Sequence, residues 1–221
     1  MRKPAKTLNA EKVAYWYFRL NGFLQIENFV VHPARRGSAR TDADLVGVRF
    51  KHRAEFAFDA DEAMADDAHL ELRTDLNEVV IVEVKTNQPC TLNGPWKHQE
   101  QANVERVLAA IGCVSMRDIP NAASRIYSQG AAEAGEFRIR LIAVGRDKCA
   151  VLALDFPRVT QLTWDEIIPF LWDRFHIYRN QKQQVDQWDS TGKSLRASAS
   201  RSTRDEFVRE TRQRMGISNQ S

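Results

Sequence analysis

The sequence predicts an α/β fold in which a mixed central β-sheet is flanked by helices. Apolar segments rich in β-branched residues alternate with amphipathic helical segments along the chain. The expected order is a helix, three strands, a helix, then one or two strands and a last helix, which is an αβββαβ core. With 43% hydrophobic and 28% charged residues, the 221-residue chain has the composition of a globular protein with one substantial core.

The first expected elements are a helix and two strands. Asn9 is a candidate N-cap, and an apolar stripe at Val13, Trp16, Tyr17 and Leu20 has helical spacing. Asn-Gly at 21–22 then ends the helix. The segment "FLQIENFVVH" predicts the first strand and "DLVGVRF" the second, while "PARRGSAR" between them reads as an exposed basic loop.

The third strand is the clearest, because residues 77–86, "NEVVIVEVKT", are almost continuously apolar and β-branched. Residues 51–77 are acidic and alanine-rich, which favours an exposed insertion between two strands. The stretch 87–95 has the Pro, Gly and Asn content of a loop. Residues 96–112, "WKHQEQANVERVLAAIG", are expected to form one helix, followed by a looser segment at 121–135.

Three further elements complete the expected domain. Residues 136–145, "EFRIRLIAVG", alternate apolar residues with arginines, so we expect a strand with one face in solvent. We expect "CAVLALDF", residues 149–156, to be its neighbouring strand. Thr163 is a candidate N-cap for a helix over 163–181.

The charge of the chain is unevenly distributed. From residue 191 onward there are seven lysines and arginines against three acids, although the whole chain carries only +3. We therefore expect a domain at 1–190 and a basic, mobile tail at 191–221, with a short helix near its end. A basic tail on a near-neutral body favours a polyanionic partner, although many charged tails are only solvated.

Composition also excludes several classes of protein. No segment approaches the ~20 apolar residues of a membrane span. The charged N-terminus lacks the apolar core of a signal peptide, and Cys90, Cys113 and Cys149 fit neither a disulfide framework nor a zinc site. We therefore expect a cytoplasmic protein with reduced thiols.

The third strand contains an acid and a base, Glu83 and Lys85, that share one face. On a wet sheet surface such a pair is a common ion pair. The flanking residues are too apolar for a wet face, and unpaired buried charges are very costly. The pair therefore indicates a site that opens onto a cleft, while Val80, Val82 and Val84 pack into the core.

A second group of acids precedes the second strand, which we expect to lie beside the third. Asp42 and Asp44 have the placement of turn formers or caps. Asp44 directly adjoins the apolar run and could share a site with Glu83. Two carboxylates with a backbone carbonyl make an oxygen-only site that suits Mg²⁺ or Mn²⁺, and a neighbouring lysine could orient or activate water.

An acid at a strand start, followed by a strand ending in E-x-K, resembles the core of the PD-(D/E)xK nuclease superfamily. The matching segments are "DADLVGV" and "VVIVEVKTN", and "AEKVAYWYFRLNGF" is similar to the leading helix of that group. The resemblance covers roughly residues 8–112. It departs in two places: Ala43 stands where the family has proline, and the acidic insertion lengthens the gap between the acids.

The resemblance implies a restriction-endonuclease-like fold and a Mg²⁺-dependent endonuclease that hydrolyses DNA. It implies that Asp44 and Glu83 bind the metal together with the Val84 carbonyl, that Lys85 is the catalytic lysine, and that Glu11 supports the metal shell. It further implies that Gln99 or Gln101 could join the site, and that the protein could be a homodimer.

Arginines in the basic loop, Arg35, Arg36 and Arg40, could hold the phosphate backbone of DNA, although they could equally be solvated surface residues. Two alternatives to the nuclease remain. The chain could be a catalytically silent member that binds DNA or protein partners, or the E-x-K pair could be structural in a domain that binds another ligand.

Overall fold

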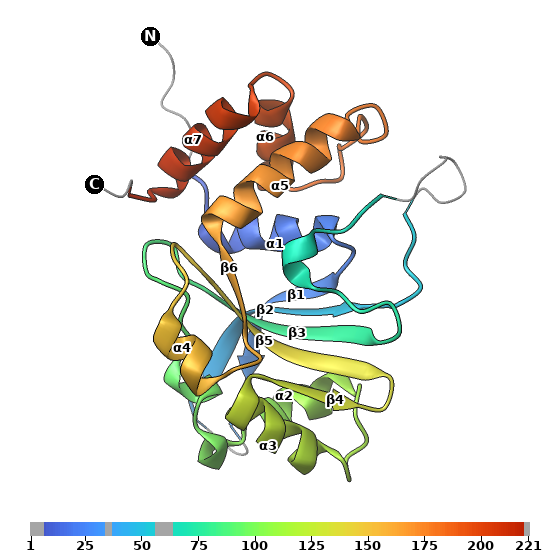
Figure 1. Ribbon diagram of the computed structural model, residues 1–221, viewed down its shortest axis with the longest axis vertical. Helices are drawn as coiled ribbons and strands as arrows, with labels where there is room; N and C mark the ends of the chain where they lie inside the picture. Colours follow the sequence, from blue (N-terminus) through green and yellow to red (C-terminus); the bar gives the residue numbers. More distant parts are fainter. Residues whose placement is uncertain (1–6, 34–36, 56–63, 219–221) are drawn as a thin grey trace.

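The computed structural model describes residues 7–33, 37–55 and 64–218, and in these residues a mixed six-stranded sheet forms the centre of the molecule (Figure 1). The strand order is β1-β2-β3-β5-β4, and β6 also pairs with β5. β3 is antiparallel to β2 and parallel to β5. The strands are β1 (Leu24–Val31), β2 (Thr41–Arg49), β3 (Asn77–Val84), β4 (Ala131–Ala134), β5 (Phe137–Gly145) and β6 (Thr160–Thr163).

Helices cover both faces of the sheet, so the predicted α/β class with a mixed, flanked sheet is confirmed (Figure 1). On one face lie α1 (Ala10–Leu20) and α5 (Trp164–Ile177), and α6 (Ser190–Ala199) and α7 (Arg204–Met215) pack on these two helices on the side away from the sheet (Figure 1). The other packs against α2 (Asn103–Ile111), α3 (Ile119–Gln129) and α4 (Ala150–Asp155). Short 3₁₀ turns are η1 (Ala68–Leu70), η2 (Gly94–Trp96) and η3 (Gln99–Gln101).

β3 is buried on both faces along its whole length. Val80, Val82 and Val84 pack in the core beneath α1 and α5, as predicted, whereas Val79 and Ile81 pack in the second core, on the side of α2 and α3. A strand between two layers of helices needs apolar residues on both faces, which explains its continuous β-branched run.

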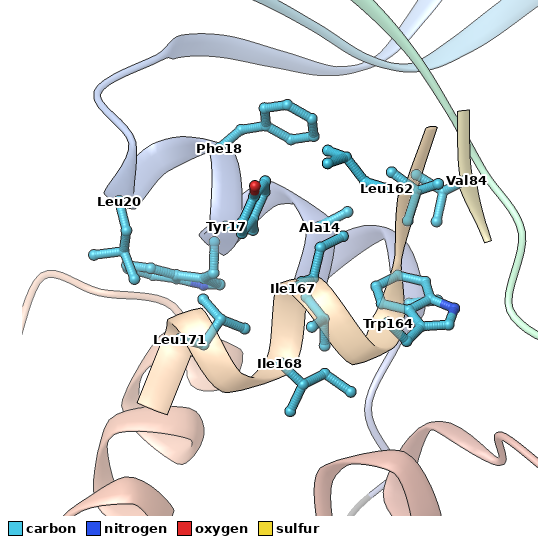
Figure 2. Packing of buried hydrophobic residues seen from close by; sticks show 14 of the residues in the cluster. Ala14, Tyr17, Phe18, Leu20, Val84, Leu162, Trp164, Ile167, Ile168 and Leu171 are labelled. Carbon is cyan, nitrogen blue, oxygen red and sulfur yellow. The ribbon is translucent and has the colours of Figure 1, made fainter. Parts of the chain in front are cut away.

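The first core joins the N-terminal helix to the later part of the chain. Ala14 and Tyr17 of α1 lie beside Ile167 of α5, whereas Phe18 points away from α5 towards Leu162, which lies next to Val84 (Figure 2). Both helices begin at the predicted caps. The Asn9 side chain accepts a hydrogen bond from the Lys12 N–H at 3.1 Å, and Thr163 forms a capping box with Glu166.

The prediction that residues 136–145 have one face in solvent was wrong. β5 lies inside the sheet, between β3 and the strands β4 and β6. Its arginines are covered because Glu78 of β3, which is 0% exposed, binds both Arg138 and Arg140. The arginines that alternate along this strand therefore belong to a buried ion-pair network. A strand with a solvent-exposed polar face has the same alternating pattern, so the sequence alone could not distinguish the two.

The prediction of a strand at residues 149–156 was also wrong. This segment contains the helix α4, and the strand that pairs with β5 on that side is β6. Short apolar runs do not by themselves distinguish helix from strand, and "AVLALD" consists largely of strong helix formers.

The helix predicted over 96–112 begins only at Asn103. The residues before it form η2 and η3, and Ala102 has a left-handed backbone with φ of 52°, which separates these turns from α2. The segment expected to be loose contains α3 and β4.

The acidic insertion at 51–77 lies partly outside the described residues, which omit Asp59, Asp61 and Glu62. Its described acids are not simply exposed. Asp66 forms ion pairs with Arg49 and Arg53, and Asp67 accepts a hydrogen bond from the Tyr17 hydroxyl at 2.9 Å. These acids join the insertion to the body of the domain.

The mobile tail predicted at 191–221 is contradicted over its described part, because residues 190–215 form α6 and α7. Leu195 and Phe207 are fully buried in the same core as α1 and α5. The Trp16 indole also donates to Asp189, the N-cap of α6, at 3.0 Å. The composition is basic and serine-rich, but these few apolar residues suffice to dock the helices.

Replacement of Phe207 by alanine should lower the free energy of unfolding by about 3 kcal/mol, because it empties a fully buried aromatic site. Urea denaturation measures this change. The exposed neighbour Arg209→Ala is the control, and we expect a change within about 0.5 kcal/mol. Equal stability of Phe207→Ala and the wild type would show that the C-terminal helices do not contribute to the core.

Among the described residues no helix has both the length and the apolar character required to cross a bilayer. Cys90, Cys113 and Cys149 are free thiols.

Candidate active site

Asp44 and Glu83 lie on adjacent strands at the same end of the sheet. Leu45 of β2 pairs with Val82 of β3, so Asp44 and Glu83 are the next residues of the two antiparallel strands. The Asp44 carboxylate also accepts a hydrogen bond from the Val84 N–H at 2.6 Å, which ties the two strand ends together. The two predicted metal carboxylates thus belong to neighbouring strand ends, and the charge of Asp44 acts on Glu83.

Lys85 lies directly beside Glu83, as their spacing in one strand requires. Its ammonium donates to Glu83 Oε1 at 2.6 Å and to Asn93 Oδ1 at 3.0 Å. Glu83 is only 3% exposed, whereas the Lys85 side chain is 21% exposed. The expectation that Glu83 opens onto a cleft is therefore modified: the lysine reaches solvent and the glutamate lies buried next to it.

Burial and neighbouring acids raise the pKa of three carboxyls in this region. Burial is the largest cause that raises the pKa of the Asp44 and Glu83 carboxyls, and the charge of Asp44 further raises that of Glu83. The pKa of Glu11 is raised by burial, then by the charges of Asp44 and Asp42, while Lys85 lowers it. Glu11, in the first turn of α1, thus lies within electrostatic range of Asp44 and Lys85.

A divalent cation fits this set of donors chemically. The carboxylates of Asp44 and Glu83 both lie within electrostatic range of the Lys85 ammonium, whose charge lowers the pKa of each. Burial is the main cause of the raised pKa values, and a bound cation would favour the ionised carboxylates. Carboxylate oxygens are the ligands that Mg²⁺ and Mn²⁺ prefer, and each Glu83 oxygen keeps an acceptor position beyond its single N–H partner.

The Val84 carbonyl is the third predicted ligand. In an extended strand the N–H and C=O of one residue point to the same side, so the Val84 carbonyl faces β2, as its N–H does. The described residues contain no group of three or more His, Cys, Asp and Glu side chains arranged as metal ligands. The candidate set is therefore two carboxylates and a carbonyl, and water would have to complete the shell.

Of the predicted DNA contacts, only Arg40 and Gln99 lie in the described residues. Arg35 and Arg36 lie outside the described residues. Arg40 is exposed, but its guanidinium donates to Asn103 Oδ1 at 3.2 Å and to the Gln101 carbonyl at 2.8 Å. Gln99 is exposed in η3, and in the described part of the chain no hydrogen bond joins it to Asp44, Glu83 or Lys85.

Sequence reasoning missed three residues that contact the site. The Trp96 indole N–H donates to Glu83 Oε2 at 3.1 Å, and Asn93 accepts from Lys85 as described above. Trp164, predicted only as a core residue, donates to the Lys85 carbonyl at 3.1 Å. The sequence Asn-Gly-Pro-Trp after the E-x-K strand is typical of a turn. It does not predict where the Trp96 side chain points.

The chain was compared with known proteins. It matches no protein-family model, no curated protein and no solved structure. The site is therefore interpreted from its own geometry and chemistry.

Proposed function

We propose that the protein is a metal-dependent nuclease that hydrolyses phosphodiester bonds in DNA. The observation that carries this proposal is the grouping of Asp44, Glu83 and Lys85 at adjacent strand ends, with two desolvated carboxylates and only one ammonium group. Burial of this kind raises the free energy of the folded chain unless a bound cation compensates it. The same grouping supports the similarity to the PD-(D/E)xK nucleases.

In this proposal each residue has a separate task. Asp44, Glu83 and the Val84 carbonyl hold Mg²⁺ or Mn²⁺, and Glu11 adds negative charge behind them. When bound, the cation lowers the pKa of a water molecule and neutralises charge on the phosphate. Lys85 is the partly exposed member, so its ammonium can orient the attacking water or stabilise the charged phosphoryl oxygens.

The C-terminal helices supply a basic surface for a polyanion. The Asn87 side chain, two residues after Lys85, donates to the Gly216 carbonyl at 2.8 Å and accepts from the Ser218 N–H at 3.0 Å. The end of α7 thus lies beside the loop that follows β3 (Figure 1). Lys193, Arg201 and Arg209 are exposed on and between α6 and α7, and such residues supply salt-dependent, sequence-independent affinity for DNA.

The decisive experiment incubates the protein with plasmid and with single-stranded DNA in Mg²⁺, Mn²⁺ or EDTA. We expect cutting that requires the metal and that the Glu83→Ala/Lys85→Ala variant loses, because this variant removes a ligand and the cationic side chain. The matched control is Glu133→Ala/Arg158→Ala, which removes an exposed ion pair on another part of the surface.

The outcomes separate the candidate functions. Metal-dependent cutting by the wild type and the control, but not by the double variant, supports the nuclease. DNA binding without cutting under any metal condition contradicts it and favours a catalytically silent DNA-binding module. Absence of both binding and cutting leaves the E-x-K pair with a structural role.

We also propose that two copies associate through β1. This strand forms an edge of the sheet, and Leu24, Ile26 and Phe50 are 67%, 57% and 54% exposed around it. Apolar groups on an unpaired edge strand favour pairing with another chain. We expect light scattering coupled to size-exclusion chromatography to give a dimer mass, and Leu24→Lys/Ile26→Lys to give a monomer mass. A monomeric wild type at micromolar concentration would contradict this.

A cytoplasmic location belongs to the same proposal. It is supported by the three free thiols, of which Cys90 is buried, since free cysteines are typical of reducing compartments.

A further inference from the structure

The short segment from Asn93 to Trp96 contacts both members of the E-x-K pair. Asn93, the N-cap of η2, accepts from the Lys85 ammonium at 3.0 Å, and Trp96 at its end donates to Glu83 at 3.1 Å. Both side chains belong to the segment that follows β3, so one short stretch of chain contacts both the acid and the base.

The Trp96 contact is built into the core. Its side chain is only 1% exposed and packs in the same cluster as Val79 and Ile81 of β3. The backbone next to it is fixed as well, because the fully buried Asn103 donates to the Pro95 carbonyl at 3.0 Å. The indole N–H is thus held in one position with respect to Glu83.

The hydrogen bonds divide the Glu83 carboxylate between two donors. Lys85 binds Oε1 and Trp96 binds Oε2, so the plane of the carboxylate is defined by one donor on each oxygen. Each oxygen keeps an acceptor position. Donors behind a metal-ligating carboxylate fix its orientation, and their loss weakens metal binding.

We propose that Trp96 is a positioning residue whose indole N–H orients the Glu83 carboxylate for a divalent cation. The inference rests on the proposed function, because it presumes that Glu83 binds a metal. It extends the proposed function by assigning a role to Trp96, which is not one of the residues Asp44, Glu83 and Lys85.

The test compares Trp96→Phe, which keeps an aromatic ring but loses the N–H, with the wild type. Isothermal titration with Mg²⁺ or Mn²⁺, without DNA, should show affinity about 10- to 100-fold lower in the variant, as for other changes behind a metal ligand. Trp172→Phe is the matched control, since its indole N–H donates to the Ser202 carbonyl between α6 and α7. This control should bind the cation like the wild type.

A spectroscopic measurement gives a second criterion. Five tryptophans give five indole N–H signals in a ¹H–¹⁵N spectrum, and the signal missing from Trp96→Phe belongs to Trp96. We expect Mg²⁺ to shift this signal. If Trp96→Phe does not fold, the other four Trp→Phe variants identify the Trp96 signal by elimination. A titration of the wild type with Mg²⁺ then shows whether this signal shifts.

The outcomes distinguish this inference from the proposed function. Wild-type affinity in Trp96→Phe, or a Trp96 signal that Mg²⁺ does not shift although the cation binds, overturns the positioning role alone. A wild-type protein that binds neither Mg²⁺ nor Mn²⁺ overturns the proposed function and the inference together. Weakened cation binding in Trp96→Phe but not in Trp172→Phe supports both.

Discussion

Replacement of Asp44 by asparagine should lower metal-dependent DNA cleavage about a thousandfold, because it removes a ligand carboxylate that supports several kcal/mol of transition-state stabilisation. The fold should persist, since the asparagine carbonyl can still accept the Val84 N–H. Cleavage rates at saturating Mg²⁺ measure the first effect, and thermal unfolding measures the second.

The pKa of Asp44 predicts whether Asp44→Asn is more or less stable than the wild type. Burial raises the pKa of Asp44, so this carboxyl contributes stability below its ordinary pKa, and the contribution is lost as the pH rises through the raised value. Ionisation of Asp44 in the folded chain therefore costs free energy, and asparagine removes this cost. We therefore expect the melting temperature of Asp44→Asn without metal to equal or exceed that of the wild type.

Asp42→Asn is the comparison for this prediction, because Asp42 is exposed at the start of the same strand. We expect it to retain cleavage within tenfold, about 1.4 kcal/mol of activation free energy. Loss of cleavage in Asp42→Asn, with retention in Asp44→Asn, would show that the wrong carboxylate has been assigned to the cation.

Replacement of Glu78 by glutamine should lower the free energy of unfolding by about 3 to 5 kcal/mol, the usual cost of removing one partner from a buried ion pair. Glu78 is 0% exposed and binds Arg138 at 2.6 Å and Arg140 at 3.1 Å. Arg140 is itself only 2% exposed, so its charge would remain buried without its carboxylate. Urea denaturation measures the loss.

Glu133→Gln is the matched control, because Glu133 also bridges two arginines, Arg73 and Arg158, but is 42% exposed. Surface pairs of this kind contribute at most about 1 kcal/mol. Similar losses for the two glutamates would mean that burial does not govern the strength of the Glu78 network.

The parts of the site that could be predicted are those that depend on neighbours in the chain. Glu83 and Lys85 share a face because side chains alternate along a strand, and this requires no knowledge of the rest of the fold. Asp44 could be placed beside them because consecutive strands commonly pair. The caps Asn9 and Thr163 were likewise readable from the residues that follow them.

The contacts that could not be predicted join residues far apart in the chain or beyond an irregular loop. The direction of the Trp96 indole depends on two 3₁₀ turns and on a left-handed backbone at Ala102. The burial of Arg138 and Arg140 depends on Glu78, 60 or more residues away. An alternating strand has the same local pattern whether its polar face meets water or a buried carboxylate.

The sequence by itself determined the α/β class, the buried character of "VVIVEV" and the shared face of Glu83 and Lys85, because each follows from local periodicity. Only the tertiary structure decided that the basic C-terminal segment docks as α6 and α7, that Glu83 is buried while Lys85 reaches solvent, and that Trp96 holds Glu83. These features arise from packing between segments that are far apart in the sequence. The residue pattern of one segment does not show which other segment it packs against.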